Sequence, residues 1–448
     1  MARTDWRKED DAVLMKPIFE TTKNYYILVA VLVTLVLWGL ISYIVQFNSG
    51  LGVTGMNFPV SWAFYIINFV FFIGISHAGT LISAILRLSQ AEWRRPVTRI
   101  AEVITVAVLG IGGMNILIDL GRPDRILNMF LYGRYQSPLL WDATSITAYL
   151  TASSVYLYIP MIPDMAILRD NCDGGWRKVL YGTLALGWIG TERQHHVLER
   201  ALAMMAVLVV PVAVSVHTVV SFVFSMTVQP MWHSTIFGPY FVVGAIFSGT
   251  AMLLIVMAVL RKVLKLEDYL QPIHFNYLGL IMLVMTILWF YFTGAEYLTA
   301  FYGNEPDEMR VFMSKWGGPY SPYFWAMVIS CFFIPLPILA INRFRTIKGT
   351  VIASVFICIG MWLERFIIII PTLANPRLHQ YEHGHYAPSI IEIGIMVGCF
   401  ALFALVYVLF SKLFPMVSIT EVREGRDDTE NIVLERLRRY TPGKGRLD

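Results

Sequence analysis

Several ionisable side chains lie inside long apolar runs of this sequence. Charged groups are costly in hydrocarbon, so each such residue indicates either a polar partner or a chemical task. Carboxylates and imidazoles can take up and release protons, so these residue types suit proton-coupled chemistry. The residues of this kind are His77, Asp119, Asp142, His217, Glu296, Glu364, Arg365 and Glu392.

Structural roles stay open for the two histidines and for the first acid. His77 or His217 can be a buried imidazole bonded to a backbone carbonyl. Asp119 can close a loop with Arg122 or Arg125. Asn68 and His77 are nine residues apart, which places them on opposite faces of an ideal helix. One site therefore cannot use both.

Structural roles stay open for the remaining acids as well. Glu364 and Arg365 can form ion pairs with neighbouring helices. Glu296 and Glu392 lie near the outer ends of their apolar runs, where exposure alone would explain them.

The connection between the third and fourth apolar runs reads DLGRPDRILNMFLYGRYQSPLLWD, from Asp119 to Asp142. A Gly-Arg-Pro break ends one helix, and Pro138 suits the first turn of the next. Asn115 and Asp119 are one turn apart on one helix face, with Arg122 placed to neutralise the acid. The sequence predicts a segment that crosses the membrane surface and restarts a helix with Asp142 one turn inside it.

The elements that position these residues are predicted to be membrane helices. The chain has 448 residues, of which 56% are hydrophobic and 15% charged. This composition, with about ten apolar runs long enough to cross hydrocarbon, predicts an all-α polytopic membrane protein. The spans are predicted near residues 25–45, 60–88, 98–119, 140–162, 197–229, 237–261, 276–302, 320–341, 349–371 and 388–412.

The distribution of Lys and Arg predicts the orientation. With the N-terminus in the cytoplasm, 28 of the 35 Lys and Arg residues fall in cytoplasmic segments and 6 in outer loops, while Arg365 lies within a span. Cytoplasmic loops carry such an excess. We therefore expect both termini in the cytoplasm and the 119–142 connection outside. The net charge of +4 reflects these anchors and predicts no nucleic-acid partner. The charged first 24 residues are unlike a signal peptide.

The four cysteines stand alone in the sequence. No CxxC or CxxCH pattern occurs, so the usual ligand sets for iron–sulfur clusters, c-type haem and structural zinc are missing. We expect buried apolar thiols and no haem or iron–sulfur cluster in this chain.

A weak internal similarity predicts two like-oriented four-helix bundles. Ser137-Pro-Leu-Leu-Trp141 matches Ser321-Pro-Tyr-Phe-Trp325, and Ala78-Gly79-Thr80 echoes Ser248-Gly249-Thr250. An acid, Asp142, follows the first tryptophan, whereas Ala326 follows the second. The first bundle is therefore predicted to bind the ligand. The expected divisions are an arm 1–24, a helix and loop 25–58, bundles 59–230 and 231–372, a last helix 373–415 and a tail 416–448, with a short surface helix near Ile432–Arg439.

An acid, a histidine and aromatic walls reached from lipid suit a quinone. Its ring is flat and apolar, and its two oxygens need polar partners. Oxidation of a quinol also requires bases that accept two protons. A carboxylate at the membrane surface and a titratable imidazole meet this demand.

The DLGRPDR and SPLLWD segments resemble those of the NrfD/polysulfide-reductase membrane-anchor family. The chain further resembles a ten-span subclass, the ActC-type subunit of bacterial alternative complex III. The segments that carry this likeness are residues 68–86, 137–145, 215–222, 231–249 and 361–366.

This resemblance implies a subunit that oxidises menaquinol or a related quinol at the outer side of the bacterial cytoplasmic membrane, with proton translocation as a further implied property. Implied partners are an iron–sulfur protein on the outer side, multihaem cytochrome c subunits and a paralogous membrane subunit.

The resemblance also implies roles for individual residues. It gives His77 and Asp142 the quinol site, with Asp119 and Arg122 as supports, and gives His217, Glu364 and Arg365 a proton path. His77 lies 17 residues from Val60, roughly 25 Å along a helix. A role for His77 as a proton relay below the quinol ring is therefore an alternative to direct contact with the ring.

Three other functions remain open at this point. A proton-conducting paralogous subunit of the ActF type shares the helix plan but has no quinol site. A secondary transporter also has repeats and buried ions, but its helix breaks lie at midplane. A di-haem cytochrome b needs two pairs of facing histidines, and His77 with His217 supplies one pair.

Overall fold

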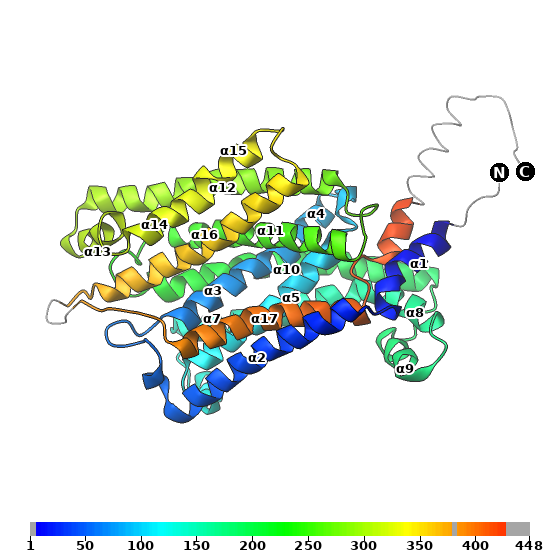
Figure 1. Cartoon of the computed structure of the whole chain (residues 1–448), viewed down its shortest axis with the longest axis horizontal. Helices are drawn as coiled ribbons and strands as arrows, with labels where there is room; N and C mark the ends of the chain where they lie inside the picture. Colours follow the sequence, from blue (N-terminus) through cyan, green and yellow to red (C-terminus); the bar gives the residue numbers. More distant parts are fainter. Residues whose placement is uncertain (1–5, 379–382, 427–448) are drawn as a thin grey trace, which may run out of the picture.

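The computed structural model describes residues 6–378 and 383–426. Within these residues the chain is helical and has no β-strand (Figure 1). The α-helices are α1 (Trp6–Phe19), α2 (Lys23–Ser49), α3 (Phe64–His77), α4 (Ser83–Leu88), α5 (Thr98–Asp119), α6 (Ile126–Leu131), α7 (Pro138–Tyr158), α8 (Ile162–Asp170), α9 (Gly175–Leu184), α10 (Glu192–Ser225), α11 (Phe237–Val263), α12 (Pro272–Gly303), α13 (Pro306–Trp316), α14 (Ser321–Val328), α15 (Pro335–Ala340), α16 (Ile347–Ala374) and α17 (Ile390–Leu413). Two π-helical turns, Ala78–Ile82 and Ile329–Phe333, join α3 to α4 and α14 to α15. The short 3₁₀ turns are Leu51–Val53, Glu92–Arg94, Pro123–Arg125 and Ile159–Met161.

The prediction of an all-α polytopic membrane protein is confirmed. In the described residues nine helices are long and apolar enough to cross a membrane. Nine of the ten predicted runs correspond to them, and the remaining run, 140–162, forms α7. The predicted tail helix near Ile432–Arg439 lies outside the described residues.

Helix α7 is less apolar than the others because it carries hydroxyl groups. Its exposed residues Thr144, Thr147 and Thr151 each donate to the carbonyl four residues earlier, at 2.8 Å. A hydroxyl bonded to its own helix no longer needs water. Helix α7 packs against α5 and α10 inside the bundle, so we assign it as a tenth span (Figure 1).

The helices pack as two groups of four that share one interface. In the first group α3 packs on α5, and α7 packs on both α5 and α10. In the second group α11 packs on α12 and α16, and α14 packs on α16. Helices α3 and α10 of the first group contact α11 of the second, and α3 also contacts α16.

The first and last spans lie side by side and form a pair of their own. Helix α2 packs along α17, which in turn contacts α5 (Figure 1). A Cβ atom on Gly39 would lie 2.8 Å from the Cα of Gly398. Only glycines allow the two backbones to approach so closely, as in other small-residue crossings of membrane helices.

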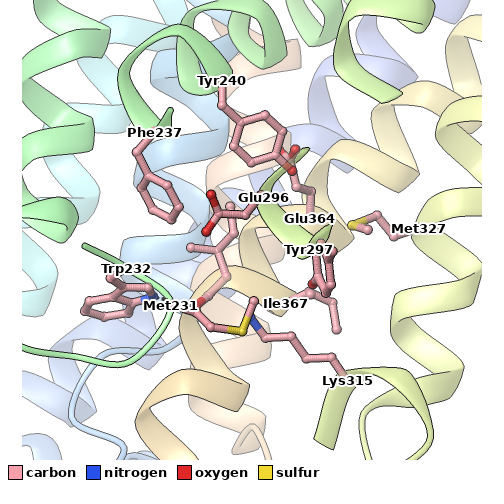
Figure 2. Close-up of a pocket in the computed structure, with 11 residues that line it drawn as sticks. Met231, Trp232, Phe237, Tyr240, Glu296, Tyr297, Lys315, Met327, Glu364 and Ile367 are labelled. Carbon is pink, nitrogen blue, oxygen red and sulfur yellow. Dashed lines mark hydrogen bonds between the residues drawn. The ribbon is translucent and has the colours of Figure 1, made fainter. Parts of the chain in front are cut away.

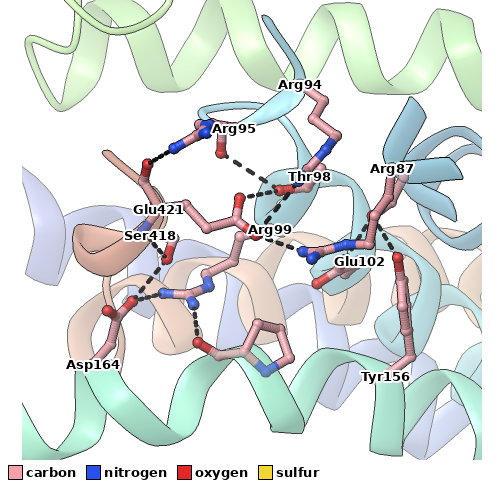
Figure 3. A network of polar contacts seen from close by, with 12 residues as sticks. Arg87, Arg94, Arg95, Thr98, Arg99, Glu102, Tyr156, Asp164, Ser418 and Glu421 are labelled. Atoms are coloured by element: carbon pink, nitrogen blue, oxygen red, sulfur yellow. Dashed lines mark hydrogen bonds and ion pairs between the residues drawn. The ribbon is translucent and has the colours of Figure 1, made fainter. Parts of the chain in front are cut away.

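Polar contacts tie the chain after α17 to one end of the bundle (Figure 3). This end also carries α1 (Figure 1). The buried Asp164 carboxylate pairs with Arg99 and accepts the backbone N–H groups of Ile419 and Thr420 at 3.2 and 2.9 Å. Glu421 lies 2.6 Å from Arg87. We call this end the α1 end and the opposite end the α13 end.

Candidate functional site

Two carboxylates mark the α13 end of the first helix group. Asp119 is the last residue of α5, and Asp142 lies in the second turn of α7. Asp142 is 5% exposed. The Oδ1 atom of each acid is buried and has no hydrogen-bond partner in the described part of the chain. An orphaned buried oxygen is unusual in a native protein and indicates a missing partner such as a ligand or water.

Arg122 does not neutralise Asp119, and that expectation is wrong. The exposed Arg122 guanidinium makes two 3.1 Å bonds to the Asp124 carboxylate. Gly121 has a positive φ of 64° and turns the chain away after α5. The arginine therefore points toward the loop, and among residues 6–378 and 383–426 no cation pairs with Asp119.

Buried polar groups follow one face of α7 below Asp142. Tyr149 and Tyr156 are 7 and 14 residues further on, close to two and four turns of helix, and both are fully buried. Tyr149 donates to the Ser76 carbonyl at 3.2 Å and also contacts the Thr80 hydroxyl. This stripe runs from Asp142 toward the interior, to the level of His77.

His77 ends α3 and is fully buried. Its Nε2 lies 2.7 Å from the Ala213 carbonyl of α10 and donates to it, while Nδ1 lies 3.3 Å from the Ile73 carbonyl. The Tyr149 ring is 5.5 Å away. Seven residues of helix separate Tyr149 from Asp142, roughly 10 Å of rise. His77 is thus a deep imidazole with both nitrogens at backbone carbonyls.

Local packing explains why α3 holds His77 there. The π turn that follows contains Gly79, whose Cβ would lie 1.8 Å from Thr105 Oγ1 of α5. Thr105 donates at 2.6 Å to the Ser76 carbonyl. The close approach and the widened turn fix the end of α3 against α5.

His217 of α10 contacts His77 directly. The ring centroids are 3.9 Å apart, with the planes at 71°. His217 is fully buried, and within the described residues neither of its ring nitrogens has a hydrogen-bond partner. A Cβ placed on Gly74 would lie 3.9 Å from His217 Nε2 and 3.2 Å from Ser248 Oγ of α11. The histidine pair therefore lies where the two helix groups meet.

Asn68 belongs to a different environment from His77. Its Oδ1 accepts a 2.9 Å bond from Trp362 Nε1 of α16, whereas His77 contacts α10. The expectation that one site cannot use both residues agrees with this arrangement.

Glu364 and Arg365 of α16 are both buried and pair with each other. Trp289 Nε1 of α12 donates to Glu364 at 2.5 Å. The Arg365 guanidinium lies 5.1 Å from the centre of the Phe241 ring. A Cβ on Gly244 would lie 3.0 Å from that guanidinium, so the glycine leaves room for it. The ion pair is thus internal to α16 and is braced by α11 and α12.

Exposure does not explain Glu296 or Glu392, because both are buried. Glu296 accepts a 2.7 Å bond from Ser234. Glu392 accepts from the Gly55 N–H, the Tyr386 hydroxyl and the Ser389 N–H at 2.7, 2.8 and 2.8 Å. The loops at the α13 end fold over these helix ends, which residue spacing along the chain cannot reveal.

Sequence reasoning missed three polar groups at or near these sites. Tyr149 can be found from its heptad spacing to Asp142. Lys315 lies on the inner face of the surface helix α13 with Val311 and Phe312, at the three- and four-residue spacing of an apolar stripe. Tyr240 contacts the Glu364 carboxylate only through tertiary packing, so no pattern in the neighbouring sequence predicts this contact.

The arrangement can accept protons at two depths. The orphaned carboxylate of Asp142 lies near the α13 end, at the level of the loops there. The histidine pair and the Glu364–Arg365 pair lie deeper and across the interface between the helix groups. Acids and imidazoles in such an order can hold and move protons.

Three relatives match nearly the whole chain. A protein of Halobacterium salinarum, provisionally named as a membrane subunit of dimethyl sulfoxide reductase, is 24% identical over 433 residues, which cover 91% of this chain and 95% of the relative. The Hdr-like menaquinol oxidoreductase integral membrane subunit of Archaeoglobus fulgidus is 26% identical over 435 residues, covering 92% and 99%. A subunit of the selenate reductase of Mesobacillus selenatarsenatis is 23% identical over 400 residues, covering 84% and 91%.

A family model gives the most direct assignment. The model described as polysulphide reductase, NrfD, matches residues 52–376, which run from the loop after α2 to the end of α16. This range includes both four-helix groups and the residues His77, Asp119, Asp142, His217 and Glu364. The chain therefore belongs to the polysulphide reductase NrfD family.

Proposed function

We propose that this chain is the quinol-oxidising membrane subunit of a multisubunit oxidoreductase of the alternative complex III type. One relative is named as a menaquinol oxidoreductase subunit and two as subunits of other reductases. The observation that carries the proposal is the buried Oδ1 of Asp142, which lacks a partner in the described residues. A quinol hydroxyl at this oxygen would supply the missing hydrogen bond.

The reaction removes two protons and two electrons from the quinol. Asp142 accepts the first proton, and Asp119, whose buried Oδ1 is likewise unpaired, is the second acceptor at this end of the bundle. Both electrons pass to an iron–sulfur protein docked against the 120–137 connection, and multihaem cytochrome c subunits carry them onward. Menaquinol is the proposed substrate.

Arg122 supports the site indirectly in this proposal. It binds Asp124 in the connection and thereby shapes the loop that follows Gly121. It does not contact either candidate base in the described residues.

The deeper residues have a different role. Because His77 bonds backbone carbonyls roughly two turns below Asp142, we assign it to proton relay and not to contact with the ring. His217, Glu364 and Arg365 continue this relay across the interface between the helix groups.

Asp142→Asn tests the proposal. The amide keeps the size and hydrogen-bonding capacity of the side chain but cannot accept a proton, so turnover of menaquinol by the assembled complex should fall by about 10²–10⁴-fold. The measurement is the steady-state rate of quinol oxidation in complexes of matched composition. Near-normal turnover would show that the acid is structural.

Ala326→Asp is the matched control. Ala326 follows Trp325 as Asp142 follows Trp141. Both indoles donate to a carbonyl of the preceding segment, Trp316 at the end of α13 and Tyr135 in the loop before α7. Ala326 is exposed, whereas Asp142 is buried. An acid added there should leave the wild-type rate unchanged and should not rescue Asp142→Asn.

A further inference from the structure

The second helix group encloses a cavity that is lined by titratable side chains. Its volume is about 20 Å³, and the charged residues in its wall are Lys315 of α13, Glu296 of α12 and Glu364 of α16. Figure 2 shows these three with Tyr240 and Tyr297 around a common space. The wall is largely apolar but carries these polar groups, and a cavity of this size holds about one water molecule.

Lys315 is the unusual member of this group. It is 3% exposed, and in the described residues its ammonium makes no direct hydrogen bond or ion pair. Its Nζ lies 5.9 Å from the centre of the Tyr297 ring. A buried ammonium without acceptors is costly. A water in the cavity would accept from it and bridge it to a carboxylate.

Glu296 faces this lysine and connects it to the molecular surface. The negative charge of Glu296 acts on Lys315, and the charges of Glu308 and His233 act on Glu296. Glu308 lies 3.4 Å from His233, whose side chain is 47% exposed. A run of titratable groups therefore leads from solvent at the α13 end to the cavity.

The inner wall of the cavity leads to the buried ion pair. The Tyr240 hydroxyl contacts the Glu364 carboxylate, and Glu364 pairs with Arg365. Both tyrosines belong to the membrane-spanning helices α11 and α12, while α13 lies outside the spans.

Burial lowers the pKa of Lys315 to about 8, and the charge of Glu296 opposes this shift. Both the ammonium and the neutral amine are then populated slightly above neutral pH. A lysine of this kind can act as an acid and as a base.

We propose that Lys315, Glu296 and one water in the cavity form a proton-exchange site between the surface at the α13 end and Glu364. A proton delivered to Glu364 passes through the water to the neutral amine of Lys315. The ammonium then gives a proton through Glu296 to the His233–Glu308 pair and solvent, and no electron moves. The inference rests on the proposed proton role of Glu364, and it adds an outlet that lies in the second helix group, apart from the quinol site.

Lys315→Arg separates proton exchange from a structural charge. Arginine keeps the positive charge but does not lose its proton in proteins. In the purified complex, oxidation of a menaquinol analogue should show an inflection near pH 8 that Lys315→Arg removes, with a rate lowered by about tenfold or more. Lys262→Arg, at an exposed position at the far end of α11, should keep the wild-type profile. A wild-type rate and profile for Lys315→Arg would overturn the proposal.

Glu296→Gln gives a second test that does not depend on how Lys315→Arg folds. Glutamine still accepts the Ser234 hydrogen bond, but it removes the charge that raises the pKa of Lys315. The inflection should therefore move to lower pH, and an unmoved inflection would contradict the site.

Binding of the quinol analogue, measured separately, should be unchanged in both variants. If the wild-type complex does not bind the quinol analogue, the proposed function is refuted. If binding is altered only in these variants, the proton site is not separate from the quinol site.

Discussion

Glu392 shows what a buried carboxylate looks like when its bonds are complete. Three donors from two outer segments converge on it, and the Ser389 side chain in turn accepts the Glu392 N–H at 3.3 Å. Asp142 has no such set of donors in the described residues. At the scale of single residues, this contrast indicates a structural role for Glu392 and a ligand-binding role for Asp142.

Glu392→Ala should destabilise the protein. It removes a charged acceptor from Gly55, Tyr386 and Ser389, and hydrogen bonds to charged groups are worth about 1.5–3 kcal/mol each. We expect a loss of roughly 3 kcal/mol or more, measured as a lower thermal midpoint in detergent. Glu305→Ala, at the exposed start of α13 where the side chain makes no capping bond, should change stability by less than about 0.5 kcal/mol. Equal midpoints for the two variants would contradict the structural role of Glu392.

Residue types in the sequence were enough to select the buried acids and histidines as candidate site residues, but not to predict what they contact. Asp142 is buried one helix turn after Ser137, as its spacing indicated. The partner of Arg122 was predicted wrongly because the positive φ of Gly121 decides its direction. Glu296, Lys315 and Glu364 approach one cavity from three helices, and only tertiary packing brings them together.

At the scale of elements, the crossing of α2 and α17 depends on small residues. Gly39 meets Gly398, and a Cβ on Gly394 would lie 2.4 Å from Ser42 Oγ. Apolar burial gives membrane helices little reason to associate, so close backbone packing supplies the contact. Gln46 of α2 also donates at 3.1 Å to the Ile118 carbonyl near the end of α5, which ties the pair to the first helix group.

Gly398→Leu should separate α2 from α17. The larger side chain cannot occupy the space taken by the Gly39 backbone, so the yield of folded protein and its thermal midpoint should both fall. Gly110→Leu is the control, because a Cβ at Gly110 meets no atom within 4 Å. A folded yield for Gly398→Leu that equals this control would show that the crossing is unimportant.

Element positions followed well from apolar run length, because each span must cover the same thickness of hydrocarbon. The ends were less predictable. Helix α12 begins at Pro272 and α10 begins at Glu192, several residues before the predicted runs 276–302 and 197–229. The π turns after His77 and within 321–340 have no sequence signal of their own and arise from packing, as Gly79 against Thr105 shows.

At the scale of the whole molecule, the orientation in the membrane remains our proposal from the Lys and Arg distribution. Arg134→Cys in the 120–137 connection should react with an impermeant thiol reagent in intact cells. Lys178→Cys in α9, at the α1 end, should react only after lysis. Both positions are exposed, and the native cysteines are buried or half-buried. The reverse labelling pattern would show that the protein has the opposite orientation in the membrane.

The two helix groups differ in which of their buried polar groups lack hydrogen-bond partners in the described residues. The first has orphaned acids near its α13 end, and the second has a water-sized cavity with a buried lysine. The His77–His217 contact lies between them. This division predicts that quinol chemistry and proton exchange can be altered separately.

A photoreactive menaquinol analogue tests the central claim most directly. Bound to the assembled complex and illuminated, it should label the α5–α7 region, residues 119–158, and excess menaquinol should prevent the labelling. Asp142→Asn should weaken the labelling, while Ala326→Asp should not. Labelling confined to the second helix group, residues 231–372, or labelling that menaquinol does not displace, would contradict a quinol site at Asp142.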